Sequence, residues 1–139
     1  MISSLFTVLA EGISIDQKTN NMSIFNLFED IGTIQLPMIV PKIIFVCSLA
    51  KEIADPDDLD VEIRFILNGN ITLRQNTRIT FTGKPKTRLI AELLGTEIRE
   101  AGTFRVEALA AGNILGGSSL NINLLTQLSQ TSGKLLNPS

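Results

Sequence analysis

The sequence predicts an all-β domain built from two packed antiparallel sheets, an immunoglobulin-like or jelly-roll-like β-sandwich of about eight or nine strands. Short apolar segments recur along the chain, and turn residues separate them about every ten residues, as in sandwiches and barrels. The chain has 139 residues, the size of one domain, and such a domain buries roughly 70% of its unfolded surface. A β-barrel is the alternative, and a sandwich with one short helix near residues 88–100 is another.

The first part of the chain is expected to form a β-hairpin. Residues 5–15 are fairly apolar and predict the first strand, and residues 22–34 predict the second. The polar run at residues 16–21 predicts the turn between them, because Asn and Asp tolerate left-handed backbone and bond to nearby backbone amides. Pro37 and Pro41 then indicate a crossing or edge segment, since proline cannot donate a hydrogen bond to a sheet.

The clearest hairpin signal lies in the middle of the chain. The continuous apolar run at residues 42–50 predicts a strand whose two faces are both covered. Apolar and charged residues alternate through residues 61–67, and Asn68-Gly69 then supplies the dipeptide that a type I′ turn requires. Residues 71–82 are the predicted return strand. Three polar side chains indicate that this strand lies at an edge or faces solvent: Arg74, Asn76 and Arg78.

The last part of the chain is expected to add three more strands. Residues 88–100 contain leucines at helical spacing, but an internal glycine and the surrounding all-β rhythm favour a strand. One strand is predicted to begin at residues 102–107, and the chain then turns at Gly112-Asn113. The last predicted strand covers residues 120–124. Gly116-Gly117 predicts an interruption in the returning strand.

One sandwich domain over residues 1–125 and a polar tail over residues 126–139 are the predicted organisation. The tail is expected to be a short helix or disordered. No run reaches the ~18 apolar residues of a membrane-spanning helix, and no basic segment of a signal peptide opens the chain. A cytoplasmic protein without a membrane partner is therefore expected.

Residue types that are missing from the sequence narrow the possible functions. Without His there is no Ser-His-Asp or Cys-His nucleophile, and no metal site with His ligands. The single cysteine, Cys47, excludes an internal disulfide and lies in an apolar run, which predicts a buried and unreactive thiol. A net charge of −2 gives no support for a nucleic-acid partner. We expect no cofactor and no enzymatic activity.

An acidic loop is the strongest candidate for a metal site. Residues 52–58 are predicted to be a loop, and Asp55, Asp57, Asp58 and Asp60 place four carboxylates within six residues. Calcium requires several hard oxygen ligands on one flexible loop, although the spacing does not match an EF-hand. The alternative is a solvated turn in which aspartate side chains accept hydrogen bonds from backbone amides.

Two further groups of charged residues could carry function. Carboxylates near the first hairpin could perform acid–base chemistry if two of them converged; they are Glu11, Asp16, Glu29 and Asp30. A basic stretch could protect an edge strand against aggregation or form part of a nucleic-acid groove, and edge protection is the favoured interpretation. The basic residues are Arg74, Arg78, Lys84, Lys86 and Arg88.

The chain resembles a family of small uncharacterised prokaryotic proteins, a domain of unknown function. The likeness lies in an opening hairpin with Ala10-Glu11-Gly12, Asp16, Thr19-Asn20 and Ser23-Ile24-Phe25-Asn26, and in the late strand Gly102-Thr103-Phe104-Arg105-Val106. It extends to about Leu124. The resemblance implies a β-sandwich and assigns no activity, cofactor or catalytic residue.

Composition points to self-association. The chain is 44% hydrophobic and only 19% charged, which is more apolar surface than a small monomer conceals easily. We expect a homo-oligomer, most simply a two-fold dimer, in which the protein is a non-catalytic binding or assembly module. One alternative is a calcium-dependent or carboxylate-based enzyme or ligand-binding domain, and another is a structural subunit of a larger assembly.

Overall fold

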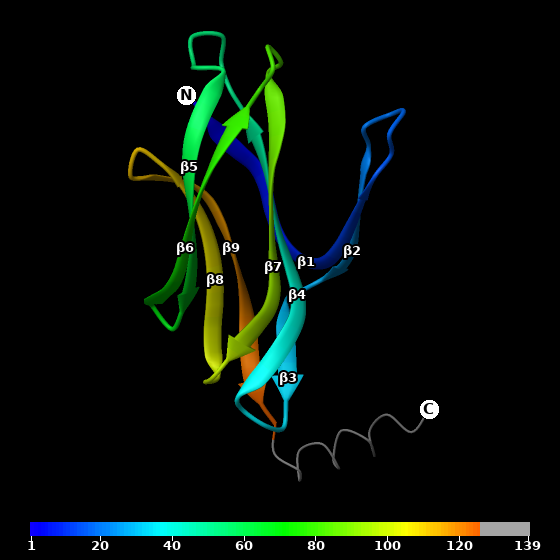
Figure 1. The fold of residues 1–139 in the computed structure, drawn as a ribbon, viewed down its shortest axis with the longest axis vertical. Helices are drawn as coiled ribbons and strands as arrows, with labels where there is room; N and C mark the ends of the chain where they lie inside the picture. The colour runs from blue at the N-terminus through cyan, green and yellow to red at the C-terminus, as the bar shows by residue number, and fades with distance from the viewer. Residues whose placement is uncertain (126–139) are drawn as a thin grey trace.

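The computed structural model describes residues 1–125. These residues fold into two facing β-sheets (Figure 1). Sheet A has the strand order β2-β1-β4-β7 and sheet B the order β3-β9-β8-β5-β6. The nine strands of the described residues are β1 (Ser3–Ile15), β2 (Met22–Leu27), β3 (Asp30–Thr33), β4 (Met38–Ala50), β5 (Asp58–Leu67), β6 (Asn70–Thr80), β7 (Lys86–Ile98), β8 (Gly102–Ala110) and β9 (Asn113–Leu124). The predicted all-β sandwich is confirmed, and the strands do not close into one barrel.

The strand order is that of an immunoglobulin-like sandwich. In immunoglobulin nomenclature, β1, β4 and β7 of sheet A occupy the places of strands A, B and E. In sheet B, β9, β8, β5 and β6 occupy the places of G, F, C and C′. Strand β2 is added at the outer edge of sheet A, and the β1–β2 hairpin projects away from sheet B (Figure 1).

Strand β4 supports both sides of sheet A. Its residues Ile43, Phe45 and Cys47 belong to the core cluster between the sheets. Ile44 and Val46 alternate with them and lie outside that cluster, yet they are only 3% and 0% exposed. A strand that is covered on both faces needs apolar residues at consecutive positions. The prediction that both faces of this strand are covered is therefore confirmed.

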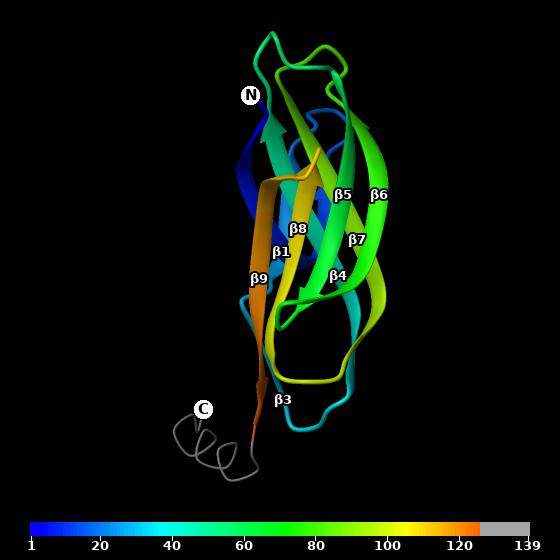
Figure 2. The same ribbon diagram turned by 90° about the vertical axis from the view of Figure 1, so that its left-hand side faces the viewer.

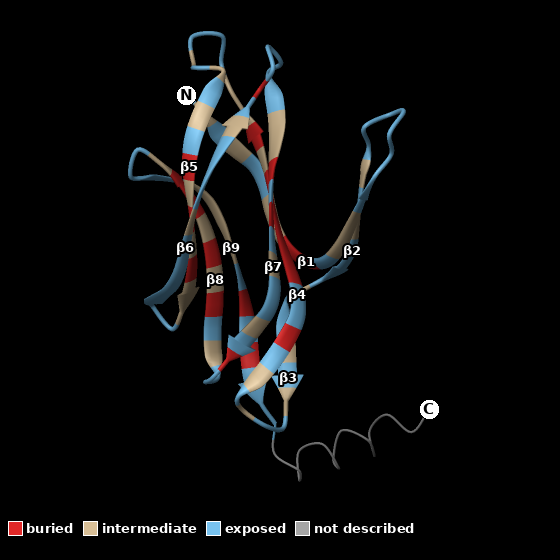
Figure 3. Ribbon diagram, in the orientation of Figure 1, coloured by how far each residue is buried: buried red, intermediate tan, exposed pale blue. Residues whose placement is uncertain are grey.

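The four largest fully buried side chains of the described core are phenylalanines. Phe45 comes from β4, Phe65 from β5 and Phe104 from β8, and Phe81 follows β6; all are fully buried. Figure 3 shows the buried residues along the middle of the facing strands and exposed residues at the tip of the β1–β2 hairpin. The core therefore joins sheet A to sheet B, while the hairpin tip lies outside it.

The hairpin between β5 and β6 forms as predicted. Asn68 and Gly69 have φ angles of 49° and 84°, which the type I′ turn requires. Asn68 also accepts a hydrogen bond from Thr103 N–H at 2.9 Å, and its side chain lies so close to Gly102 that a Cβ there would overlap it. Strand β6 lies at the edge of sheet B, as its polar residues predicted.

The segment near residues 88–100 is a strand and not a helix. Strand β7 pairs antiparallel with β4 over nearly its whole length. The pairing skips Pro41 and Gly95, and Gly95 has a φ of 65°, which glycine adopts at little cost. Pro37 lies between β3 of sheet B and β4 of sheet A, so the predicted crossing of the chain is confirmed there, whereas Pro41 lies within β4 and not in the crossing segment.

The prediction of one strand over residues 22–34 is wrong. The chain leaves sheet A after β2 and enters sheet B as β3, which pairs in parallel with β9 (Figure 2). Asn26, near the end of β2, has a φ of 56°, a left-handed conformation that interrupts the strand. Apolar residues recur on both sides of this break, so the sequence pattern does not reveal the change of sheet.

The prediction of an interruption at Gly116-Gly117 is also wrong, because β9 continues through both glycines. They lie where β1 approaches β9. A Cβ on Gly116 would be 2.8 Å from Thr7 Cγ2, and Thr7 Oγ1 donates a hydrogen bond to the Gly117 carbonyl at 2.6 Å. Gly116 therefore permits close contact between β1 and β9, whereas a Cβ on Gly117 would meet the Arg105 side chain of β8. The helix or disorder predicted for residues 126–139 lies outside the described residues.

Truncation of a core phenylalanine should destabilise the fold strongly. We expect Phe104→Ala to lower the free energy of unfolding by about 3–5 kcal/mol, since it removes buried surface and leaves a cavity. Ile71→Ala on exposed β6 should cost less than about 1 kcal/mol. Urea denaturation of both variants measures the difference, and equal losses would contradict the assigned core.

Candidate functional site

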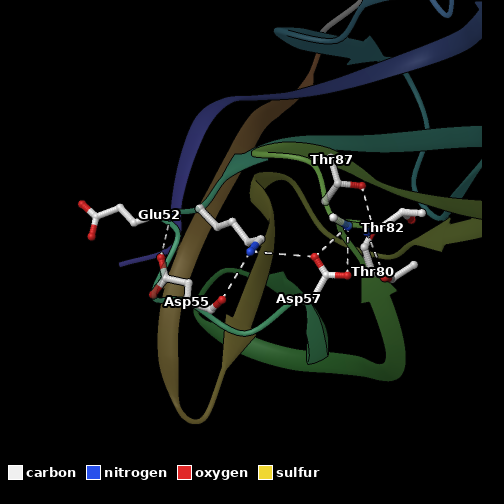
Figure 4. Close-up of polar contacts among 8 residues, drawn as sticks. Glu52, Asp55, Asp57, Thr80, Thr82 and Thr87 are labelled. Atoms are coloured by element: carbon white, nitrogen blue, oxygen red, sulfur yellow. Dashed lines mark hydrogen bonds and ion pairs between the residues drawn. The ribbon is translucent and has the colours of Figure 1, made fainter.

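The acidic loop between β4 and β5 is held by hydrogen bonds and ion pairs within the protein (Figure 4). Asp55 Oδ2 accepts a hydrogen bond from Glu52 N–H at 2.8 Å and lies 2.8 Å from the Met1 ammonium group. The ammonium group is also 2.9 Å from Glu52 Oε2. The hydrogen bond from the Met1 ammonium, followed by that from Glu52 N–H, lowers the pKa of Asp55. The Asp55 carboxylate is thus already hydrogen-bonded and ion-paired within the protein.

Asp57 joins the acidic loop to the loop between β6 and β7. Gly83 N–H donates to its two carboxylate oxygens at 2.9 and 3.1 Å, and Phe81 N–H donates to its carbonyl at 2.8 Å. Lys51 Nζ lies 3.8 Å from Asp57 Oδ1 and donates to the Asp55 carbonyl at 3.3 Å. Asp57 therefore accepts hydrogen bonds from a backbone amide, as expected if the acidic loop is a solvated turn and not a metal site.

Asp58 and Asp60 point to other surroundings. Asp60 forms an ion pair with Arg78 at 3.6 Å across the β5–β6 hairpin. Asp58, the first residue of β5, is exposed. Over residues 1–125, no three acidic or cysteine side chains are grouped so that they could hold a metal ion. The four predicted metal candidates are therefore near in sequence, but their carboxylates do not converge.

The carboxylates near the first hairpin are also dispersed. Asp16 accepts hydrogen bonds from Lys18 N–H and Thr19 N–H at 2.8 and 3.0 Å. These bonds, that of Thr19 first, lower the pKa of Asp16 and fix the turn of the β1–β2 hairpin. Glu11 lies on β1, and Glu29 and Asp30 lie where the chain enters sheet B. The arrangement gives Asp16 a structural role in the turn.

Sheet A carries the most exposed apolar side chains. Half of the sixteen exposed large hydrophobic residues of the described chain lie on its strands, twice as many as on the strands of sheet B. Those on sheet A are Leu5, Phe6, Ile15, Phe25, Leu27, Ile39, Ile90 and Leu94. Composition predicted excess apolar surface, but only the fold places half of these exposed residues on one sheet.

Strand β2 differs from the other edge strands. Its sequence, Met22 to Leu27, contains no charged residue and no proline. By contrast, β6 carries Arg74 and Arg78, β7 carries two basic and two acidic residues, and β3 has only four residues and begins with Asp30. Charges and short length are the usual protection of an exposed strand edge. The edge of β2 lacks the charged protection and is the candidate binding surface.

In the described chain, no helix is long and apolar enough to cross a membrane.

Asp57→Ala should destabilise the protein whether or not calcium is present. The loss of the acceptor for Gly83 N–H should lower the free energy of unfolding by about 1–2 kcal/mol. Asp58→Ala, the matched control, removes a neighbouring exposed carboxylate and should cost less than about 0.5 kcal/mol. Thermal melts with calcium or with a chelator measure both effects, and a calcium-dependent rise in Tm that Asp57→Ala abolishes would contradict the structural role.

Cys47 should not react in the native state. The thiol is fully buried, and burial raises its pKa from 9.0 to about 11, so it stays protonated at pH 8. We expect a disulfide reagent to modify no thiol of the native protein at pH 8, and one thiol per chain in urea. Rapid reaction of the native protein would show that β4 is accessible.

No curated protein matches the chain. A similar solved structure is the alkylpurine DNA glycosylase AlkC from Pseudomonas fluorescens bound to DNA containing an abasic site analog, with a TM-score of 0.52 and 11% identity. The match covers 88% of this chain and 30% of the glycosylase chain, and at this identity it shows the sandwich fold alone.

Two further structures are similar at lower scores. An immunoglobulin-like protein from Pseudomonas aeruginosa has a TM-score of 0.47 and 13% identity, over 88% of this chain and 97% of that one. A β-glucosidase from Listeria innocua in complex with glucose has a TM-score of 0.43 and 8% identity, over 88% of this chain and 16% of the enzyme.

The sequence itself identifies the family. A family model described as a family of unknown function, DUF6941, matches residues 5–123. The matched region includes the opening hairpin and the Gly102–Val106 motif, and it ends at residue 123 in β9, close to the Leu124 that the resemblance predicted. The chain therefore belongs to this family of unknown function.

Proposed function

We propose that the protein is a non-catalytic assembly module that binds a second copy of itself through strand β2. The observation that carries this proposal is the uncharged, unpaired edge of β2 on the sheet with the most exposed apolar side chains. A two-fold axis beside β2 would pair it with its counterpart in antiparallel orientation. The four strands of sheet A would then continue into those of the second copy.

Backbone chemistry supports pairing at this edge. Strand β2 pairs with β1 on one side, and within the described residues no strand lies on its other side. Its outer N–H and C=O groups are therefore free to bond another strand. An identical copy satisfies both sets of groups at once, because an antiparallel pair exchanges donors and acceptors symmetrically.

Apolar side chains add a driving force. Phe25 and Leu27 of β2 are 51% and 57% exposed, and removing such surface from water is favourable by roughly 25 cal/mol per Å². The net charge of −2 is small, so like-charge repulsion between two copies is weak. Both terms favour a second copy as the partner over a strongly charged molecule.

The proposal has further parts: the protein has no catalytic activity, no cofactor and no nucleic-acid partner, and it is located in the cytoplasm. The acidic loop supports a protein without catalytic activity, because Asp55 and Asp57 already accept hydrogen bonds from backbone amides. No contact of the described residues favours a calcium-dependent or enzymatic role. A structural subunit of a larger assembly could use the same β2 edge, and it differs from the dimer in its number of copies.

Phe25→Lys should disrupt the dimer. A lysine on β2 adds the charge that protects other edges, and we expect it to weaken self-association at least about tenfold. The control, Leu73→Lys, changes a residue of similar exposure on β6, the edge of sheet B, and should leave association unchanged. Multi-angle light scattering across the micromolar range measures the mass against the 15.1 kDa of the chain.

The possible masses separate the alternatives. A wild-type mass of two chains that Phe25→Lys lowers to one chain supports the proposal. A wild-type protein that is monomeric at every concentration would overturn it, as would a dimer that Leu73→Lys disrupts while Phe25→Lys does not. A mass that keeps growing with concentration would favour the subunit of a larger assembly.

A further inference from the structure

Basic residues surround a pocket between the tip of the β1–β2 hairpin and strand β7. The pocket has a volume of about 500 Å³, a size that suits a small molecule. Ile15 and Asn20 line it from the hairpin side, and Arg88 and Ile90 line it from β7. Lys84 and Lys86 complete its basic side, and its lining contains no carboxylate. No residue of β2 lines it.

The three basic residues of the pocket differ from most other Lys and Arg residues in forming no ion pair with a carboxylate of the described residues. Residues 1–125 contain eleven Lys and Arg residues, and seven of them form an ion pair with a carboxylate. Of the four others in this part of the chain, three line the pocket: Lys84, Lys86 and Arg88. A concave site lined by charges of one sign concentrates the field and attracts a counter-ion.

Arg88 is already oriented in the free protein. Its Nη2 donates a hydrogen bond to the Asn20 carbonyl at 2.6 Å, and Nη1 approaches Asn20 Oδ1 at 3.4 Å. A guanidinium group has five N–H donors, so these contacts leave donors for a ligand. Fixing the side chain in advance lowers the entropy that binding would otherwise cost.

We propose that this pocket binds a small molecule that carries a phosphate group on an apolar body. Three cations match the charge of a phosphate dianion better than that of a single carboxylate, and both Arg and Lys bind phosphate oxygens well. Ile15 and Ile90 are 41% and 37% exposed and supply apolar contact for the rest of the molecule. A nucleic acid would require a longer track of basic residues than three in one pocket.

Phenyl phosphate is a suitable probe because it joins a phosphate dianion to an apolar ring. Isothermal titration should show one site per chain, with tighter binding than inorganic phosphate or phenol. Lys84→Gln and Lys86→Gln should each weaken binding by about three- to fivefold, the effect expected of one exposed charge. The matched control is Lys18→Gln, which removes an unpaired exposed lysine outside the pocket lining and should change the affinity little.

Thermal melts of each variant confirm that it is folded, which is expected because Lys84 and Lys86 are exposed. Phe25→Lys should bind phenyl phosphate as the wild type does, because β2 does not line the pocket. The same titration of this variant therefore tests ligand binding separately from self-association. The inference is overturned if phenyl phosphate does not bind at millimolar concentration, or if Lys18→Gln weakens binding as much as the pocket variants. Tighter binding of a single-stranded oligonucleotide than of phenyl phosphate would also overturn it.

Discussion

The apolar core between the sheets, whose largest side chains are phenylalanines, is the packing on which the rest of the structure depends. Phe45 of sheet A and Phe65 and Phe104 of sheet B belong to one cluster of buried side chains, and Thr7 and Gly117 bring β1 close to β9 beside it. The loops at the sandwich ends and the β1–β2 hairpin take their positions from these strands. The chain achieves this without a disulfide or an aromatic residue other than phenylalanine, so close packing supplies the uniqueness of the fold.

Signals that act over a few residues could be read from the sequence. The type I′ turn at Asn68-Gly69 and the doubly covered strand β4 depend on neighbouring residues, and both were predicted. The errors at residues 22–34 and at Gly116-Gly117 have a different origin. In each case the backbone responds to a strand far away in the sequence, β9 in the first case and β1 in the second, and no local pattern reports such a contact.

The same distinction explains what could be predicted about function. Four aspartates within six residues suggested a metal site, but sequence proximity does not fix direction, and Asp57 turns to Gly83 while Asp60 turns to Arg78. The basic residues at 84, 86 and 88 belong to the basic stretch that begins at Arg74 in the sequence. Their pocket could not be predicted, because Ile15 and Asn20 on its other side come from a hairpin about 70 residues earlier.

The β1–β2 hairpin connects the two proposed surfaces. Its outer strand β2 is the edge offered to a second copy, while its tip residue Asn20 holds Arg88 of the basic pocket on the opposite edge of sheet A. A two-stranded hairpin is only marginally stable by itself, so contacts at its tip and along its edge both help to fix its position.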